Sequence, residues 1–271
     1  MSRIVVGAVA LVGLLSFSAV QAQQKLEHKG WGSLVGKVTY DGNPPVPDNL
    51  IPRMMIHADK ACCLNEKAKP LEKIDQTWIV DAKTKGVANV MVYLKVPAGT
   101  YIPTHAKYKN RNDTVVIDQP HCAFLPRVSG YNPSYFDDAG KLVPSGQKLT
   151  IKNSASVSHN VRATTNPVFN KPFNENMPPM TESERIFKAQ PLPITLQCDV
   201  HTWMSARLFV FDHPYYAITK ADGSFEIPFV PAGAQIGVAA YHEDVGYLLT
   251  KDGKQMVLKE GENRFDFQIK K

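Results

Sequence analysis

A long series of short β-type runs is the feature that most constrains the fold of this chain. Each run clusters β-branched and aromatic residues, and turn signals such as Asp41-Gly42, Asp222-Gly223 and Asp252-Gly253 separate the runs. Regularly spaced short strands of this kind are typical of sandwiches, so we predict an all-β fold. The predicted strands cover residues 33–40, 87–94, 114–117, 148–151, 194–196, 206–211, 224–227 and 236–241.

Signals for other structure are few. Thr181 to Gln190, with Ser183-Glu-Arg-Ile-Phe, is predicted to form one helical turn. Pro167 to Pro179 is rich in Pro and Asn, and we predict a long loop there.

The N-terminus has the pattern of a secretory signal peptide. Arg3 gives a positive start, Ile4 to Val20 is apolar, and Val20-Gln-Ala22 is a small-residue cleavage motif. We predict that residues 1–22 are removed, that the protein is periplasmic or secreted, and that no stable membrane span remains. An uncleaved membrane anchor is the alternative, because the apolar run is close to the shortest length that spans a bilayer.

The charge pattern argues against nucleic-acid binding. The formal net charge is +6, but the Lys residues are scattered along the chain and form no basic run. A mildly basic surface is better suited to steering an acidic protein partner.

One short segment carries a set of soft metal ligands. Cys198-Asp-Val-His-Thr-Trp-Met204 contains a thiol, an imidazole and a thioether, and His159 lies upstream in the strand-like run Ser158-His-Asn-Val161. A Cys-x2-His pair can reach one metal from a loop between two antiparallel strands, and Met204 can then reach one pole. Two His and one Cys in a plane, with a weak axial Met, form the ligand set of a blue copper site. We predict one type 1 copper per chain, bound by His159, Cys198, His201 and Met204.

Other interpretations of these residues exist. Cys198 could belong to a disulfide, Met204 could fill the core, and His159 and His201 could be ordinary strand and loop residues. Their combined spacing, with strands on both sides of the loop, favours the metal site. Zinc is a rival ion, but zinc sites favour a compact tetrahedral set and gain nothing from a Met.

The remaining cysteines are odd in number. In an oxidising compartment thiols usually pair, and Cys62, Cys63 and Cys122 remain if Cys198 binds metal. We predict a disulfide between Cys122 and either Cys62 or Cys63, with one thiol left over. A vicinal Cys62–Cys63 bridge is the alternative.

The ligand motif resembles the cupredoxins, and its tight Cys-x2-His-x2-Met loop is most similar to that of amicyanin. The resemblance implies that His159 is a buried ligand, that His201 is the more exposed imidazole, and that Met204 is axial. Asn160 follows the first His as in those proteins, where the main-chain N–H at this position hydrogen-bonds the thiolate. The chain departs from the pattern in having no Pro beside His201.

The two ends of the chain resemble a carboxypeptidase regulatory-like domain, a sandwich of the transthyretin type. The resemblance rests on Gly36-Lys-Val-Thr-Tyr-Asp-Gly42 near the start and on Thr219-Lys-Ala-Asp-Gly-Ser-Phe225 with Pro231-Ala-Gly233 near the end. The metal motif lies between them. We therefore predict a cupredoxin Greek-key sandwich at 106–211, inserted into a discontinuous sandwich of 30–105 and 212–271. Three consecutive pieces are the alternative.

The whole chain also resembles secreted bacterial plastocyanin-like proteins, often labelled methylamine-utilisation proteins. The resemblance includes Cys122-Ala-Phe-Leu-Pro-Arg-Val128 and Asp212-His-Pro-Tyr-Tyr. In that group the cysteine is commonly followed by Pro-His-Val, and Arg127 replaces the His here.

These observations predict an electron carrier and not an enzyme, since the chain has no nucleophile motif, phosphate loop or paired carboxylates. The expected partner is a redox protein such as a c-type cytochrome or a dehydrogenase. His201 would be the electron port, and Trp203, Met177 and Met180 would form an apolar docking patch around it. Simple packing over the end of the sandwich is the alternative for that loop.

The alternative function is periplasmic copper binding, storage or delivery. In that case Met54, Met55 and Cys62 would hold additional Cu(I), although a Met pair also fills cores. A third hypothesis makes the chain the copper module of a larger oxidase or reductase assembly.

Overall fold

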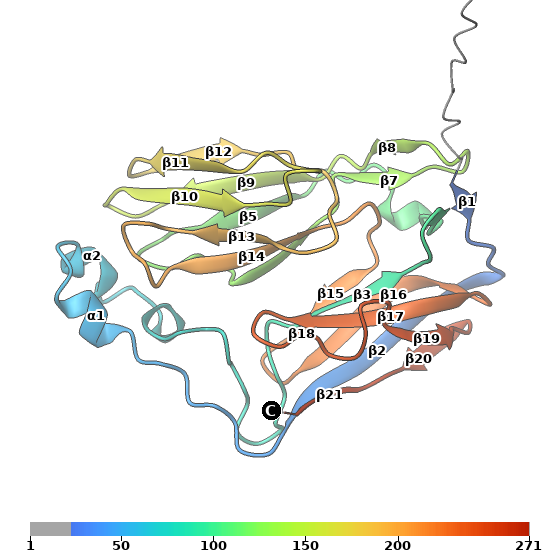
Figure 1. Cartoon of the computed structure of the whole chain (residues 1–271), viewed down its shortest axis with the longest axis horizontal. Coiled ribbons are helices and arrows are strands. Elements are labelled where there is room, and N and C mark those ends of the chain that lie inside the picture. Colours follow the sequence, from blue (N-terminus) through green and yellow to red (C-terminus); the bar gives the residue numbers. More distant parts are fainter. Residues whose placement is uncertain (1–22, 271) are drawn as a thin grey trace, which may run out of the picture.

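The computed structural model describes residues 23–270, and strands dominate it, which confirms the all-β prediction. The predicted signal peptide at 1–22 lies outside the described residues. The strands form two β-sandwiches that lie against each other (Figure 1). Between residues 23 and 270, no helix has the length and apolar character needed to cross a bilayer.

The first sandwich is built from strands between residues 114 and 210. Alternating residues of its two sheets face a shared core that includes Ile117, Ile151, Val161, Leu196 and Leu208. This alternation explains why short β-branched runs predict these strands. One sheet has the order β11 (Phe173–Met177), β10 (His159–Thr164), β13 (Ile194–Gln197), β14 (Ser205–Val210) and β6 (Val128–Tyr131), and the other has the order β12 (Thr181–Glu184), β9 (Lys148–Asn153) and β5 (Thr114–Asp118). A hairpin of β7 (Ser134–Phe136) and β8 (Leu142–Pro144) extends from it.

The second sandwich takes its strands from both ends of the chain. Its core includes Leu34, Val38, Val92, Ile227 and Val238. One sheet contains β2 (Gly30–Asp41), β16 (Ser224–Ala232), β20 (Gly261–Arg264) and β21 (Phe267–Lys270), and the other contains β3 (Met91–Lys95), β15 (Tyr216–Ile218), β17 (Gln235–His242), β18 (Gly246–Tyr247) and β19 (Lys254–Val257). The short strands β1 (Gln24–Lys25) and β4 (Thr100–Tyr101) pair with each other. The first sandwich thus lies between β3 and β15 in chain order. The transthyretin type of the second sandwich and the exact domain limits stay predictions.

An apolar layer joins the two sandwiches. Met91 and Tyr93 of β3 form a buried cluster with Val128 of β6 and with Phe209 and Phe211 at the end of β14. Burial of this cluster fixes how the sandwiches sit on each other, because apolar surface removed from water stabilises the contact.

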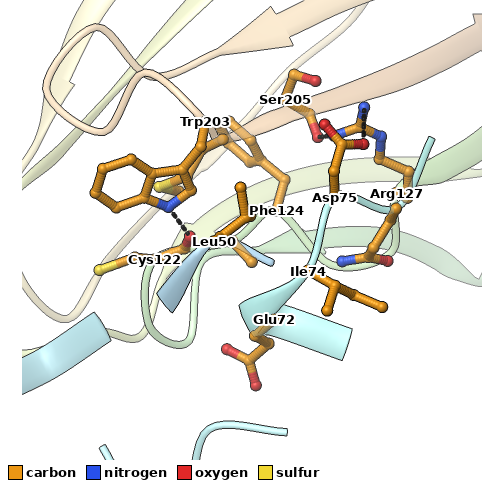
Figure 2. Close-up of a pocket in the computed structure, with 12 residues that line it drawn as sticks. Leu50, Glu72, Ile74, Asp75, Cys122, Phe124, Arg127, Trp203 and Ser205 are labelled. Carbon is orange, nitrogen blue, oxygen red and sulfur yellow. Dashed lines mark hydrogen bonds and ion pairs between the residues drawn. The ribbon is translucent and has the colours of Figure 1, made fainter. Parts of the chain in front are cut away.

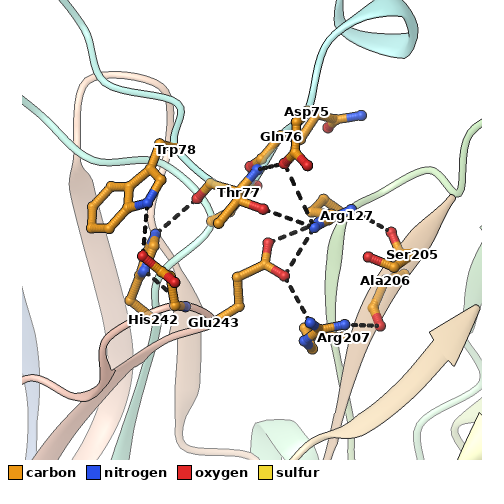
Figure 3. A network of polar contacts seen from close by, with 12 residues as sticks. Asp75, Gln76, Thr77, Trp78, Arg127, Ser205, Ala206, Arg207, His242 and Glu243 are labelled. Atoms are coloured by element: carbon orange, nitrogen blue, oxygen red, sulfur yellow. Dashed lines mark hydrogen bonds and ion pairs between the residues drawn. The ribbon is translucent and has the colours of Figure 1, made fainter. Parts of the chain in front are cut away.

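A buried ion-pair network lies beside this layer (Figure 3). Arg127, just before β6, donates from Nε and Nη2 to the two carboxylate oxygens of Glu243, at 2.8 and 3.0 Å. Arg207 of β14 contacts the same carboxylate at 3.1 Å. Arg127 also donates from Nη2 to Thr77 Oγ1 at 3.0 Å. Arg127 therefore links the two sandwiches.

Residues 50–64, which we call the cap, depart from the predicted organisation. They were expected to belong to the second sandwich, but they form α1 (Ile51–Met55) and α2 (Lys60–Cys63) and lie at one end of the first (Figure 1). The physical reason is their apolar face: Leu50, Met54 and Cys63 are buried in the core of the first sandwich. A disulfide between Cys63 and Cys122 fixes the cap there. A short 3-10 helix, η1 (Pro70–Lys73), follows.

Two local predictions are wrong. The segment from Thr181 is not a helical turn, because β12 pairs with β9 and alternates half-buried and exposed residues. The segment 167–179 is not loop throughout, because β11 pairs with β10 and sets Met177 opposite His159. In both places the segment becomes the edge strand of a sheet, and its backbone hydrogen bonds to the neighbouring inner strand outweigh the weak local preference.

Candidate metal centre

Three of the predicted ligands converge at one end of the first sandwich. His159 opens β10, while Cys198 and His201 lie in the turn that connects β13 to β14. The Nδ1 atoms of His159 and His201 are 3.1 Å apart. The Sγ atom of Cys198 is 3.9 Å from Nδ1 of His159 and 3.7 Å from Nδ1 of His201.

This triangle fits one metal ion. With bonds of about 2.0 Å to nitrogen and about 2.3 Å to sulfur, as in zinc sites, a trigonal plane requires separations of about 3.5 Å between nitrogens and about 3.7 Å from nitrogen to sulfur. In the structure the nitrogen–nitrogen side is 3.1 Å and the two nitrogen–sulfur sides are 3.9 and 3.7 Å, close to these values. The residues present therefore fit a trigonal metal ion such as copper.

The imidazoles are held in the form that binds metal. Burial lowers the pKa of His159 to about 4, and the nearby His201 adds to this effect. Burial also lowers the pKa of His201, with a further contribution from His57. Neutral imidazoles have a free lone pair, so no proton must leave before a metal binds.

A tight turn places the fourth predicted ligand. The N–H of Met204 donates to the carbonyl of His201 at 2.8 Å, and the N–H of Cys198 donates to the carbonyl of Met204 at 3.3 Å. Met204 is buried in the same cluster as Cys198. Its role as the axial ligand stays a prediction.

Asn160 organises the turn through its side chain. Its Oδ1 accepts the N–H of Asp199 at 2.6 Å and lies 3.2 Å from Cys198 Sγ. Its Nδ2 donates to Asn174 at 2.7 Å and to the Asp199 carboxylate at 3.1 Å. The resemblance implied a bond from the main-chain N–H of Asn160 to the sulfur, whereas the structure gives this bond to the N–H of His201, at 3.4 Å.

We expect Asn160→Ala to weaken copper binding by about 10–100-fold, the usual cost of losing a residue that orients a metal ligand. The matched control is Asn170→Ala, since Asn170 is equally buried but binds the 188–190 segment. Both affinities are measured by competition with a chelator. Equal losses in the two variants would contradict a specific role for Asn160.

The cap covers His201, which the resemblance had implied to be the more exposed imidazole. Both His159 and His201 are 0% exposed. The Nε2 atom of His201 lies 3.1 Å from the carboxylate of Asp59, and its ring centroid is 4.5 Å from that of His57. The expected exposure is therefore wrong, because a segment far away in sequence packs over this ring.

The predicted docking residues differ in how far they are exposed to solvent. Met180 is 74% exposed, whereas Met177 is buried and cannot be part of a surface patch. Trp203 is half-buried and its indole N–H donates to the carbonyl of Cys122 at 3.1 Å (Figure 2). A docking role for Trp203 and Met180 stays a prediction.

The cap also brings further ligand-type groups to the centre. Cys63 lies with His57 and His201 in a group whose ligand atoms are within 4.8 Å of one another, and Cys122 lies in such a group with His159 and His201. Cys63 and Cys122 form the disulfide, and Cys62 is a free, buried thiol. The predicted ligand set lacked His57 and Asp59. The sequence feature that could have pointed to His57 was the segment Met54-Met55-Ile-His57, which is rich in soft metal ligands.

The space beside the ligand turn is small. A cavity of about 10 Å³ lies next to it, with Leu50, Cys122, Arg127, Trp203 and Met204 in its walls (Figure 2). This volume admits about one water molecule. A substrate has no room there.

No family model and no curated protein matches the chain. Among solved structures, it is similar to a purple cupredoxin from Nitrosopumilus maritimus, with 15% identity and a TM-score of 0.26 over 36% of this chain and 99% of that one. It is also similar to a reduced amicyanin variant, with 13% identity and a TM-score of 0.29, and to an oxidised amicyanin variant, with 13% identity and a TM-score of 0.28. Each covers 44% of this chain and 99% of the amicyanin. At these scores the likeness says nothing about metal or activity.

Proposed function

We propose that the protein is a type 1 (blue) copper protein that passes single electrons between redox partners. The observation that carries the proposal is the buried triangle of two Nδ1 atoms and one Sγ atom. A thiolate favours Cu(I), and imidazole suits both oxidation states. A copper ion that is bound stably in both states can gain and lose one electron.

The surroundings support a carrier over an enzyme. The ligands come from a strand end and a hydrogen-bonded turn, so they are fixed before any metal binds. Such a site changes little between oxidation states. The neighbouring cavity is the size of one water, which leaves no place for a substrate at the ligand turn. In this proposal the electrons come from and go to partner proteins, such as a c-type cytochrome or a dehydrogenase, outside the cytoplasm.

The test is a visible absorption spectrum of the purified protein after addition of Cu(II), followed by reduction with ascorbate. We expect an intense blue band that bleaches on reduction and returns on oxidation, at one copper per chain. A protein that binds copper without this band lacks the thiolate–copper bond, and that result would reject the proposal.

A second candidate function is copper storage or delivery. The observation that favours it is the complete cover over His201, since a carrier usually exposes one ligand edge to its partner. Met54 does not add to this case, because it is 0% exposed in the core, while Met55 is 59% exposed. Colourless binding of more than one Cu(I) per chain would favour this function over electron transfer.

A further inference from the structure

The metal centre is sealed. His159 and His201 are 0% exposed, and Cys198 and Met204 are each 2% exposed. A copper ion in solution therefore has no path to these atoms in the closed structure. Something must move before the ion can enter, and the cap is the segment whose Asp59 and His57 lie directly on His201.

The disulfide holds the cap in its closed position. Cys63 ends α2 in the cap, and Cys122 lies in the loop before β6, at a sequence separation of 59 residues. Both are 1% exposed. Once this bond has formed, it opposes any opening of the cap, because the cross-link ties α2 to the body of the first sandwich.

Before the bond forms, the same two positions carry soft thiol ligands. Cys63 of the cap is grouped with His57 and His201, and Cys122 with His159 and His201, so the two thiols connect the cap to the triangle of His159, Cys198 and His201. Thiolates bind Cu(I) strongly, and imidazole completes such sites. The groups thus form a continuous series of ligands from His57 to the buried centre.

We propose that Cys63 and Cys122 in their dithiol form, together with His57, are an entry site for Cu(I). Copper passes from this site to His201 and the centre, and disulfide formation then seals the cap over it. The inference rests on the proposed function in one respect only, namely that the copper centre is the destination.

The sealing step is an ordinary thiol–disulfide exchange. The Cys63 and Cys122 thiols lose two protons and two electrons as their S–S bond forms, and an oxidising protein disulfide takes them up as it becomes a dithiol. The copper has by then left these sulfurs and stays Cu(I).

The neighbouring cysteine provides a matched control. Cys62 is also buried, at 6% exposed, and it sits beside Cys63 in α2. It is a free thiol, and the groups around His57 and His201 contain Cys63 and Cys122 in its place. The proposal therefore assigns copper binding to Cys63 and none to Cys62.

The experiment uses the full chain with Cys198→Ser, which removes the thiolate of the main centre. Cu(I) is titrated against a chromophoric Cu(I) chelator, with the disulfide either intact or reduced by a phosphine. We expect the reduced protein to bind about one Cu(I) and the oxidised protein to bind none. Adding Cys63→Ser should abolish the binding, and adding Cys62→Ser should preserve it.

Three results would overturn the proposal: equal binding in the oxidised and reduced forms, loss of binding with Cys62→Ser, or loss of the native near-UV circular dichroism on reduction. Loss of the circular dichroism signal would overturn the proposal because the entry site exists only while the cap is folded. A blue wild-type protein whose reduced Cys198→Ser form binds no Cu(I) rejects the entry site and keeps the proposed function. If the reduced Cys198→Ser protein binds Cu(I) but the copper-loaded wild type is not blue, the proposed function is rejected and the entry site is kept.

Discussion

Replacing Cys198 with serine is expected to abolish the intense blue absorption of the copper-loaded protein, while replacing Cys62 with serine should leave it unchanged. Both residues are free cysteines and both are buried. Only Cys198 lies within bonding range of a metal held by the two imidazoles, at 3.9 and 3.7 Å from their Nδ1 atoms. The blue band comes from the thiolate–copper bond, so a hydroxyl at this position cannot reproduce it.

The measurement compares visible spectra and copper content of wild type, Cys198→Ser and Cys62→Ser at equal protein concentration. Near-UV circular dichroism checks that all three are folded. If Cys198→Ser stayed blue, the sulfur ligand would have to be another cysteine, and the assignment of Cys198 would be wrong. Loss of the band in Cys62→Ser with native circular dichroism would point to the same error.

The sequence predicts the strands and the convergence of three ligands well because both depend on local patterns. Alternating apolar residues give the strands of both sandwiches, since one face of each strand must be buried. The Cys198-x2-His201 spacing needs only a tight turn between two neighbouring strands. His159 then requires one further pairing, that of β10 with β13.

The cap could not be predicted, because it depends on contacts between distant parts of the chain. No local pattern shows that Asp59 and His57 pack on His201, more than a hundred residues later. The sequence also leaves open whether Cys62 or Cys63 pairs with Cys122. The structure shows Cys63 as the partner, because the orientation of α2 about its axis determines which cysteine faces Cys122. The exposure of His201 was predicted wrongly for the same reason.

Replacing Glu243 with alanine is expected to cost about 3–5 kcal/mol of unfolding free energy, because it removes the closest carboxylate from a buried positive charge. The side chains of Arg127 and Glu243 are 8% and 6% exposed, and Arg207 contacts the same carboxylate. Without it, Arg207 loses this carboxylate, and the only carboxylate contact that Arg127 keeps is the one with Asp75, at 3.9 Å. The matched control is Asp266→Ala, whose partner Arg264 is 58% exposed; exposed pairs contribute about 0–1 kcal/mol.

Urea unfolding of wild type, Glu243→Ala and Asp266→Ala measures the difference. Equal midpoints for the two variants would show that the network contributes no more than a surface pair.

Arg127 also donates from Nη1 to the carbonyl of Ser205 at 2.8 Å, directly after Met204. Glu243 touches none of the copper triangle, so the folded variant should keep its blue band. The network then acts by fixing one sandwich on the other, while the start of β10 and the turn between β13 and β14 hold the metal ligands.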